Sequence, residues 1–228
     1  MNILIIGAGG VTSYLLPVLL KAFEIKELTL IDKDVLEERN LDRQLFDPSL
    51  VGENKATALA SLTNEALGDR GKDKIVEVMH EFFTANTEIP DNLDLIICCA
   101  DNHEARKNAM IVAKSLDIPA YVAGNEYFDS QAFVFNRFNW DEDDPKNPFQ
   151  KYPEILTSKV GSPISCQGDE QVAHPQLAIA NFAAASKILH LMYVWEIWSQ
   201  AEGLKLLMED PQLIPTEIYG TMFATQHA

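Results

Sequence analysis

The amino-acid sequence predicts an α/β fold built on a doubly wound, mostly parallel sheet. Short apolar runs alternate with segments of helical periodicity, at the spacing that crossover connections between parallel strands require. The first apolar run leads directly into a glycine cluster that opens a helical pattern, as a tight strand-to-helix turn demands. A chain of 228 residues can bury one substantial core, so we expect a single domain over 1–228.

The expected elements follow one another in alternation. Apolar or alternating runs predict strands at residues 2–6, 27–32, 74–80, 93–100, 118–125 and 130–138. Apolar residues at helical spacing predict helices at residues 9–23, 51–67 (beginning near Gly52) and 102–116. This order describes a Rossmann-like sheet with helices on both faces, formed by residues 1–138.

The character of the sequence changes after Phe138. Residues 139–172 are rich in Pro, Asp, Asn and Lys and lack periodicity, which predicts a long crossing loop. Residues 173–228 then predict a long Ala-rich helix, from about Ala173 to Gln200, followed by a terminal strand or hairpin.

Charge and cysteine usage exclude several classes of protein. A net charge of −16 argues against a nucleic-acid-binding protein, because phosphate contacts need clustered Lys and Arg. Cys98, Cys99 and Cys166 form no CxxC pair, so neither a disulfide framework nor structural zinc is expected. The reducing cytoplasm is the compartment that this usage favours.

No membrane segment is expected. The N-terminus has no basic region before its apolar run, which indicates a strand rather than a signal peptide. Residues 177–198 are strongly apolar, but Asn181, Lys187, His190 and Glu196 interrupt them. We therefore expect a buried or interface helix there rather than a transmembrane one.

The glycine cluster points to a nucleotide. Gly7, Gly9 and Gly10 let the backbone turn tightly at a helix N-terminus, whose free N–H groups attract phosphate. Asp32 ends the next strand, where a carboxylate can accept hydrogen bonds from ribose hydroxyls. Thr12 stands where the ordinary dinucleotide fingerprint has a third glycine. The pattern predicts an adenosine nucleotide and makes residues 1–138 a nucleotide-binding core.

A dense polar stretch, "EERNLDRQLF", follows the second predicted strand. A dinucleotide needs few arginines there, whereas a triphosphate or a leaving pyrophosphate is suited to guanidinium. Arg43 and Lys55 can converge on the β and γ phosphates. The alternative is a solvated charge cluster that caps a helix, and the stretch alone does not decide between the two.

Asp101 follows the fourth predicted strand. A carboxylate at the carboxyl edge of such a sheet can hold Mg²⁺ against phosphates. Its position also fits the N-cap of the next helix, and spacing alone favours the cap.

Four motifs together resemble the ThiF/MoeB/HesA family, whose eukaryotic relatives are the ubiquitin-activating enzymes. They are "GAGGV", "DKD…RNLDRQ", "VGENKA" and "ADNHEAR", and the resemblance covers residues 1–138. It implies an enzyme that uses ATP and Mg²⁺ to adenylate the C-terminal carboxylate of a ubiquitin-like or sulfur-carrier protein. It also implies a homodimer.

The resemblance implies roles for individual residues. Asp32 would bind ribose, Asp101 would hold Mg²⁺, and Arg106 would support the site. Arg43, Lys55 and Asp101 would carry the chemistry. Asn40, Arg43, Gln44 and Lys55 would bind the triphosphate. The implied nucleotide-binding set is Gly7, Gly9, Gly10, Asp32, Asp34, Asn40, Arg43, Gln44, Lys55 and Asp101.

The chain departs from the family pattern in two further ways. Arg39 replaces the Ser that precedes "NL", and the chain starts at the first strand, without the helix whose arginine reaches a partner's ATP site. Arg39, another arginine or a partner chain would have to substitute for it. The missing helix leaves open a second function, that of an inactive scaffold subunit. A third is an NAD-dependent oxidoreductase, for which Gly7 to Asp32 would suffice.

Cys166 raises a separate possibility. In some family members a cysteine attacks the adenylate and carries the modifier as a thioester, and Cys166 lies where such a cysteine can occur. The run through Gln176, Asn181 and Ala184 also weakly resembles ThiF proteins of PRTRC systems. An inert, partly buried thiol is an equally good interpretation. Cys98 and Cys99 lie within an apolar strand and are expected to be packing residues.

Overall fold

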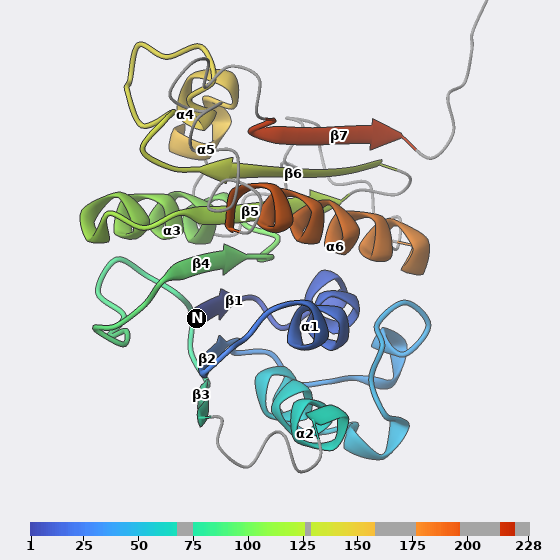
Figure 1. Cartoon of the computed structure of the whole chain (residues 1–228). Coiled ribbons are helices and arrows are strands. Elements are labelled where there is room, and N and C mark those ends of the chain that lie inside the picture. The colour runs from blue at the N-terminus through green and yellow to red at the C-terminus, as the bar shows by residue number, and fades with distance from the viewer. Residues whose placement is uncertain (68–74, 126–128, 158–176, 197–214, 222–228) are drawn as a thin grey trace, which may run out of the picture.

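A computed structural model describes residues 1–67, 75–125, 129–157, 177–196 and 215–221. These form a sheet with the strand order β3-β2-β1-β4-β5-β6-β7 (Figure 1). The strands are β1 (Asn2–Ile6), β2 (Glu27–Ile31), β3 (Ile75–Met79), β4 (Leu95–Cys98), β5 (Ala120–Asn125), β6 (Asp129–Phe135) and β7 (Glu217–Thr221). β1 to β5 are parallel, whereas β6 runs antiparallel to both β5 and β7. The predicted α/β class with a mostly parallel sheet is confirmed.

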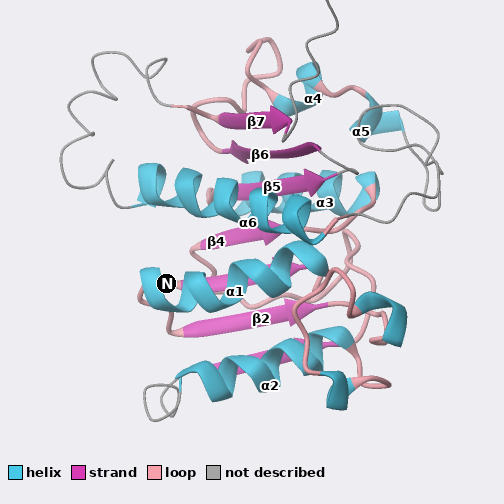
Figure 2. Ribbon diagram, turned by 90° about the vertical axis from the view of Figure 1, so that its right-hand side faces the viewer, coloured by secondary structure: helices cyan, strands magenta, loops and turns pink. Residues whose placement is uncertain are grey.

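The helices cover both faces of this sheet (Figure 2). They are α1 (Gly10–Ala22), α2 (Lys55–Leu67), α3 (His103–Leu116), α4 (Pro148–Lys151), α5 (Glu154–Thr157) and α6 (Ala178–Met192). α1, α2 and α6 lie on one face, and α3 lies on the other with α4 and α5 beyond it. Short 3₁₀ turns at Glu38–Asn40 and Pro48–Leu50 follow β2.

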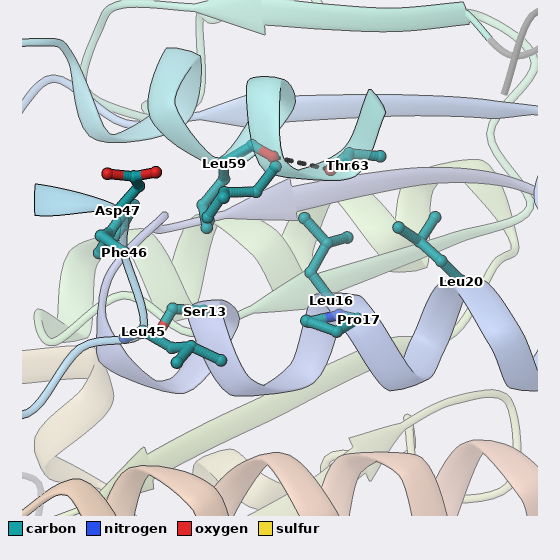
Figure 3. A pocket seen from close by; sticks show the side chains of 10 residues that line it. Ser13, Leu16, Pro17, Leu20, Leu45, Phe46, Asp47, Leu59 and Thr63 are labelled. Atoms are coloured by element: carbon teal, nitrogen blue, oxygen red, sulfur yellow. Dashed lines mark hydrogen bonds between the residues drawn. The ribbon is translucent and has the colours of Figure 1, made fainter. Parts of the chain in front are cut away.

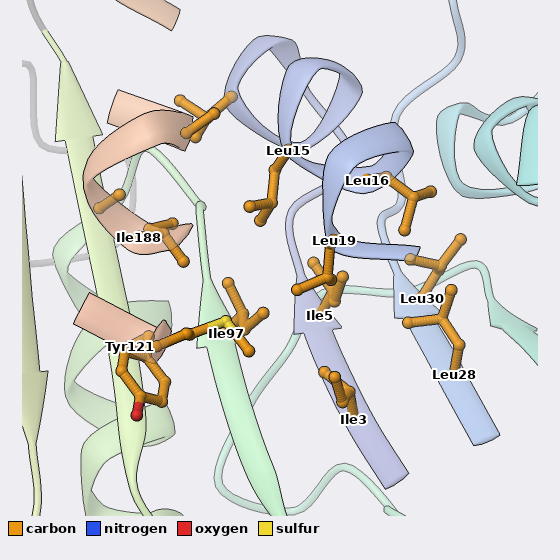
Figure 4. Packing of buried hydrophobic residues seen from close by; sticks show 14 of the residues in the cluster. Ile3, Ile5, Leu15, Leu16, Leu19, Leu28, Leu30, Ile97, Tyr121 and Ile188 are labelled. Carbon is orange, nitrogen blue, oxygen red and sulfur yellow. The ribbon is translucent and has the colours of Figure 1, made fainter. Parts of the chain in front are cut away.

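The central strands are buried on both faces, which is why they read as continuous apolar runs. Ile3 and Ile5 of β1 pack against the α1 and α6 side (Figure 4). Leu4 and Ile6, which point the other way, pack on the α3 side. The sheet is therefore packed between two hydrophobic cores, one on each face, which hold the carboxyl ends of its strands in place.

α2 begins three positions later than predicted. Gly52 has a φ of +99°, the left-handed conformation that a helix cannot contain. The Asn54 side chain then accepts hydrogen bonds from the backbone N–H groups of Ala56 and Thr57, as an N-cap does. Lys55 consequently stands in the first turn of the helix.

The predicted crossing loop is not structureless in its described part, residues 139–157, because α4 and α5 lie within it. Asn147 is 1% exposed, and its side chain caps α4 at Phe149 N while donating to Asp141 O. The polar residues that indicated a loop therefore act partly as caps, which the compositional pattern could not reveal.

The long helix is shorter in the described part of the chain than predicted. α6 begins at Ala178 and ends at Met192, and a π-helical turn over 193–196 follows it directly. The predicted terminal strand is confirmed as β7. Cys166, Gln176 and the predicted helix ends at Ala173 and Gln200 lie outside the described residues. None of the described helices combines the length and hydropathy that a membrane span requires.

Candidate functional site

The predicted site residues gather at the carboxyl ends of β1, β2 and β4, which are neighbours in the sheet. Gly7 follows β1 with a φ of +91°, and a Cβ there would lie 2.8 Å from the backbone N of Ala100. Only glycine fits this conformation and this close approach. The turn thus runs directly past the loop that carries Asp101.

Asp32 links the glycine turn to the end of β2. Its Oδ2 accepts the N–H of Ala8 at 2.7 Å, and its Oδ1 accepts the N–H of Asp34 at 2.8 Å. Burial raises the pKa of the Asp32 carboxyl, while these two hydrogen bonds and the nearby Lys55 oppose the rise. Each oxygen keeps a lone pair for a ligand donor.

The neighbouring glycines Gly9 and Gly10 meet different surroundings. A Cβ at Gly9 would find no described atom within 4 Å, so this position faces open space. A Cβ at Gly10 would lie 2.3 Å from Nδ2 of Asn181. Gly9 is the N-cap of α1 and offers no side-chain cap, which leaves first-turn N–H groups of the helix for a ligand.

The segment after β2 is held by its own side chains. Asn40 is 6% exposed, and its Oδ1 accepts the N–H of Glu37 in a reciprocal capping box. Half of the Asn40 amide is therefore engaged in the loop itself. Oε1 of Gln44 is buried and has no hydrogen-bond partner among the described residues.

Both candidate cations are paired with neighbouring carboxylates. Nη1 of Arg43 donates to Oδ1 of Asp42 at 2.8 Å, and also to the carbonyl of Arg39 at 2.7 Å. Nζ of Lys55 lies 3.3 Å from Oδ2 of Asp34. The lysine and arginine side chains are 12% and 22% exposed, whereas the carboxylates are 50% exposed or more. Two mostly buried cations are thus paired with exposed counterions.

Arg39 does not contribute its side chain to this arrangement. It forms an ion pair with Glu37 and is 76% exposed. The expected substitution of Arg39 for an arginine reaching the nucleotide therefore has no support in this geometry.

Asp101 is not the N-cap of α3, contrary to the prediction. Asn102 takes that position, and its Oδ1 accepts the N–H of Ala105 at 2.8 Å. The backbone at Asn102 has the extended conformation of an N-cap, so the helix starts one residue later than spacing suggested. Asp101 is exposed, and its carboxylate makes no hydrogen bond or ion pair with any described residue.

Arg106 lies beneath this loop and is 5% exposed. Its Nε donates to the carbonyl of Ala100 at 3.0 Å, and its guanidinium lies against Gly124 at the end of β5. His103, in the first turn of α3, is also buried at 5% exposed. The loop that presents Asp101 is thereby braced from two sides.

Sequence reasoning gave Asn181 no structural role, although it joins three parts of the site. It is 0% exposed, and its Nδ2 donates to the carbonyl of Arg43 at 2.9 Å. Its Oδ1 accepts from Nδ2 of Asn125 at 3.0 Å. A polar residue within the Ala-rich start of the helix was the available signal, but it reveals no partner.

The described cysteines are packing residues, as predicted. Cys98 is 0% exposed, and burial raises the pKa of the Cys99 thiol to about 12. The Cys99 thiol is therefore protonated at neutral pH. Cys166 lies outside the described residues.

A cavity of about 530 Å³ lies apart from these residues, between α1 and α2 (Figure 3). Its lining is mostly apolar, with Leu45, Phe46 and Asp47 closing one end. The predicted nucleotide-binding residues do not line it.

The profile of the ThiF family matches residues 1–200. The chain belongs to the ThiF family. The adenylyltransferase and sulfurtransferase UBA4 of Eremothecium gossypii is 29% identical over 193 residues, which are 84% of this chain and 41% of that protein. SUMO-activating enzyme subunit 2 of Dictyostelium discoideum is 30% identical over 144 residues, 60% of this chain and 20% of that protein. This ThiF chain thus spans less than half the length of these relatives.

Solved structures share the ThiF fold of this chain. E. coli MccB with ATP has a TM-score of 0.60 at 20% identity, covering 84% of this chain and 54% of that one. MccB with AMPCPP and MccA has a TM-score of 0.56 at 20% identity, covering 81% and 52%. The resemblance inferred from four short motifs is therefore confirmed at the level of family and fold.

Proposed function

We propose that this chain binds ATP and Mg²⁺ at the carboxyl ends of β1, β2 and β4 and adenylates the C-terminal carboxylate of a ubiquitin-like or sulfur-carrier protein. The observation that carries the proposal is the position of Asp32. Its carboxylate accepts the N–H of Ala8, so a ribose group at Asp32 places the attached phosphates over the glycine turn. The names of the relatives, among them an adenylyltransferase and an ATP-bound MccB, agree with this chemistry.

The glycine turn and the loop after β2 fit the parts of a nucleotide triphosphate. Gly9 has room for close backbone approach, and the start of α1 lacks a side-chain cap that would compete with phosphate. Oε1 of Gln44 needs a donor, which a ribose hydroxyl or base amino group has and a phosphate lacks.

Arg43 and Lys55 supply positive charge for pyrophosphate as it leaves. Their present partners, Asp42 and Asp34, are exposed carboxylates. Because these carboxylates are exposed to solvent, phosphate oxygens can take their place beside the two cations. Guanidinium and ammonium groups aimed at a growing negative charge lower the barrier to adenylation.

Mg²⁺ would be held by Asp101 together with phosphate oxygens. The described residues contain no group of three or more potential metal-binding side chains, which suits a Mg²⁺ ion that takes most ligands from its substrate and water. The uncommitted carboxylate of Asp101 fits this role. When bound, the ion neutralises phosphate charge.

The proposal includes a homodimer in the cytoplasm and, as a second step, thioester formation on Cys166. Sedimentation velocity of the purified chain measures its oligomeric state, and a monomer at working concentrations would contradict the proposed homodimer. The second step depends on a carrier protein and is tested separately below.

The decisive experiment is ATP–pyrophosphate exchange with a small protein that ends in Gly-Gly and is encoded beside this chain. Exchange is expected with that protein, and Arg43→Ala should abolish it while leaving thermal unfolding unchanged. Calorimetry that shows NAD binding without ATP binding would instead establish the oxidoreductase alternative. ATP binding without exchange would indicate a scaffold subunit.

A further inference from the structure

Asn181 connects the helix α6 to the loop that carries Arg43. Its side chain is completely buried, as are Ala180, Ala184 and Ala185 of the same helix. A buried amide without partners is costly, so its two hydrogen bonds are strongly specified. Nδ2 donates to the carbonyl of Arg43, and Oδ1 accepts from Asn125.

The loop itself has few other anchors. Among the hydrogen bonds of the described residues, two join residues 41–46 to other elements. One runs from Leu45 N to Oγ of Ser13 at 2.9 Å, and the other is the bond from Asn181 to Arg43. The remaining bonds of the segment stay within the loop. Besides the packing of Leu41 and Phe46 against the core, one hydroxyl and one amide therefore hold this loop to other elements.

The same amide also touches the glycine turn. A Cβ at Gly10 would lie 2.3 Å from Nδ2 and 2.7 Å from Oδ1 of Asn181, so the side chain lies directly on the Gly10 backbone. One rigid group thus sets the separation between Arg43 and the first turn of α1. These are the two features that would hold opposite sides of a polyphosphate.

We propose that Asn181 is a positioning residue that sets Arg43 at the distance from the glycine turn needed for a triphosphate, and so produces a preference for ATP over AMP. This inference rests on the proposed nucleotide site. The residue at this position must donate a hydrogen bond to the Arg43 carbonyl and must fit against the Gly10 backbone. Asn meets both requirements, whereas Asp lacks the donor and Gln is too long for the space above Gly10. AMP, which lacks the β and γ phosphates, does not depend on the position of Arg43.

A double-mutant cycle tests the inference. Calorimetry with Mg²⁺ measures the dissociation constants of ATP and AMP for the wild type, Asn181→Asp, Arg43→Ala and the double variant. We expect Asn181→Asp to weaken ATP about 10-fold, the loss expected for one misplaced charge-assisted hydrogen bond, and to change AMP by less than about 2-fold. In the Arg43→Ala background it should have no further effect on ATP.

Several outcomes would overturn the inference. Equal losses for ATP and AMP would show a general structural role, and independent, multiplicative losses in the cycle would show that Asn181 does not act through Arg43. If Asn181→Asp fails to fold, Asn181→Ala removes the same donor without introducing a charge and is held to the same criteria. Asn108→Ala is the matched control, because Asn108 is 7% exposed and lies on α3 across the sheet. It should leave the ratio of ATP to AMP affinity unchanged.

The outcome for the wild type separates this inference from the proposed function. If the wild type does not bind ATP, the nucleotide site itself is wrong. If it binds ATP in preference to AMP and the Asn181 variants keep that preference, only the positioning role is wrong.

Discussion

Alanine substitutions at Gly9 and Gly10 should differ sharply in their effect on the stability of the fold, although the two residues are adjacent. At Gly10 the new Cβ would lie 2.3 Å from Nδ2, 2.6 Å from Cγ and 2.7 Å from Oδ1 of Asn181. These contacts are too short for real atoms, so the buried amide must move and give up its hydrogen bonds. At Gly9 the same Cβ meets no described atom within 4 Å, and the φ of −92° is one that alanine adopts.

The cost at Gly10 can be built from its parts. Overpacking a tightly packed site costs about 1–3 kcal/mol, and each lost hydrogen bond about 1 kcal/mol. The better helix propensity of alanine returns up to about 1 kcal/mol. The free energy of unfolding of Gly10→Ala should therefore fall by about 3 kcal/mol, which lowers the melting temperature of a chain of this size by about 6–12 °C.

Gly9→Ala should instead change the free energy of unfolding by less than about 0.5 kcal/mol. Its methyl group would stand where the backbone of the turn approaches phosphate, so ATP affinity should fall by about 10-fold or more. Gly10→Ala should weaken ATP binding as well, because the displaced Asn181 amide releases the carbonyl of Arg43.

Urea denaturation followed by circular dichroism measures the stability of both variants, and calorimetry with Mg²⁺ and ATP measures binding. A Gly10→Ala protein as stable as the wild type would refute the packing of Asn181 against the turn. Wild-type ATP affinity in Gly9→Ala would refute the approach of phosphate to this turn.

Three further predictions concern single side chains. Asp101→Asn should weaken the dependence of ATP affinity on Mg²⁺, measured by calorimetry with and without EDTA, and should leave stability unchanged because Asp101 is exposed; a dependence as large as in the wild type would exclude Asp101 as the ligand. Burial raises the pKa of Glu196 above 4.5, so its contribution to stability is full below that value and is lost as pH rises through the folded pKa. Glu196→Gln should keep the bond from Tyr121 and lose less stability than the wild type as pH rises above 4.5 in urea titrations, and parallel pH profiles would contradict this. Cys166→Ala should leave pyrophosphate exchange intact and eliminate any thiol-sensitive conjugate on non-reducing gels; a conjugate that persists would exclude Cys166 as its carrier.

The fold was predictable because its signals are local. Strands buried on both faces read as continuous apolar runs, and the turn at Gly7 needs a conformation that only glycine adopts freely. The alternation of these signals with helical periodicity implied parallel pairing, which the register of β1 with β2 and β4 confirms. Four motifs at consistent spacing then identified the family.

The details of the site were less predictable because they depend on partners distant in sequence. Asn181 lies 138 residues from Arg43, and no local pattern announces the bond between them. The cap of α3 is Asn102 rather than Asp101, since both residues suit an N-cap and only the backbone conformation decides. Spacing likewise could not separate the open position of Gly9 from the crowded one of Gly10.

The charge of the chain bears on which form of the nucleotide it would accept. A net charge of −16 opposes the approach of a polyanion, but salt screens that repulsion beyond about 8–10 Å. Close to the site the balance is set instead by Arg43 and Lys55, whose exposed partners Asp42 and Asp34 can be displaced. Each displacement leaves a free carboxylate near the phosphates, so the nucleotide must bring compensating positive charge with it. If the proposed nucleotide site is correct, ATP that already carries Mg²⁺ should therefore bind this chain more tightly than free ATP, with Asp101 as the proposed protein ligand of that ion.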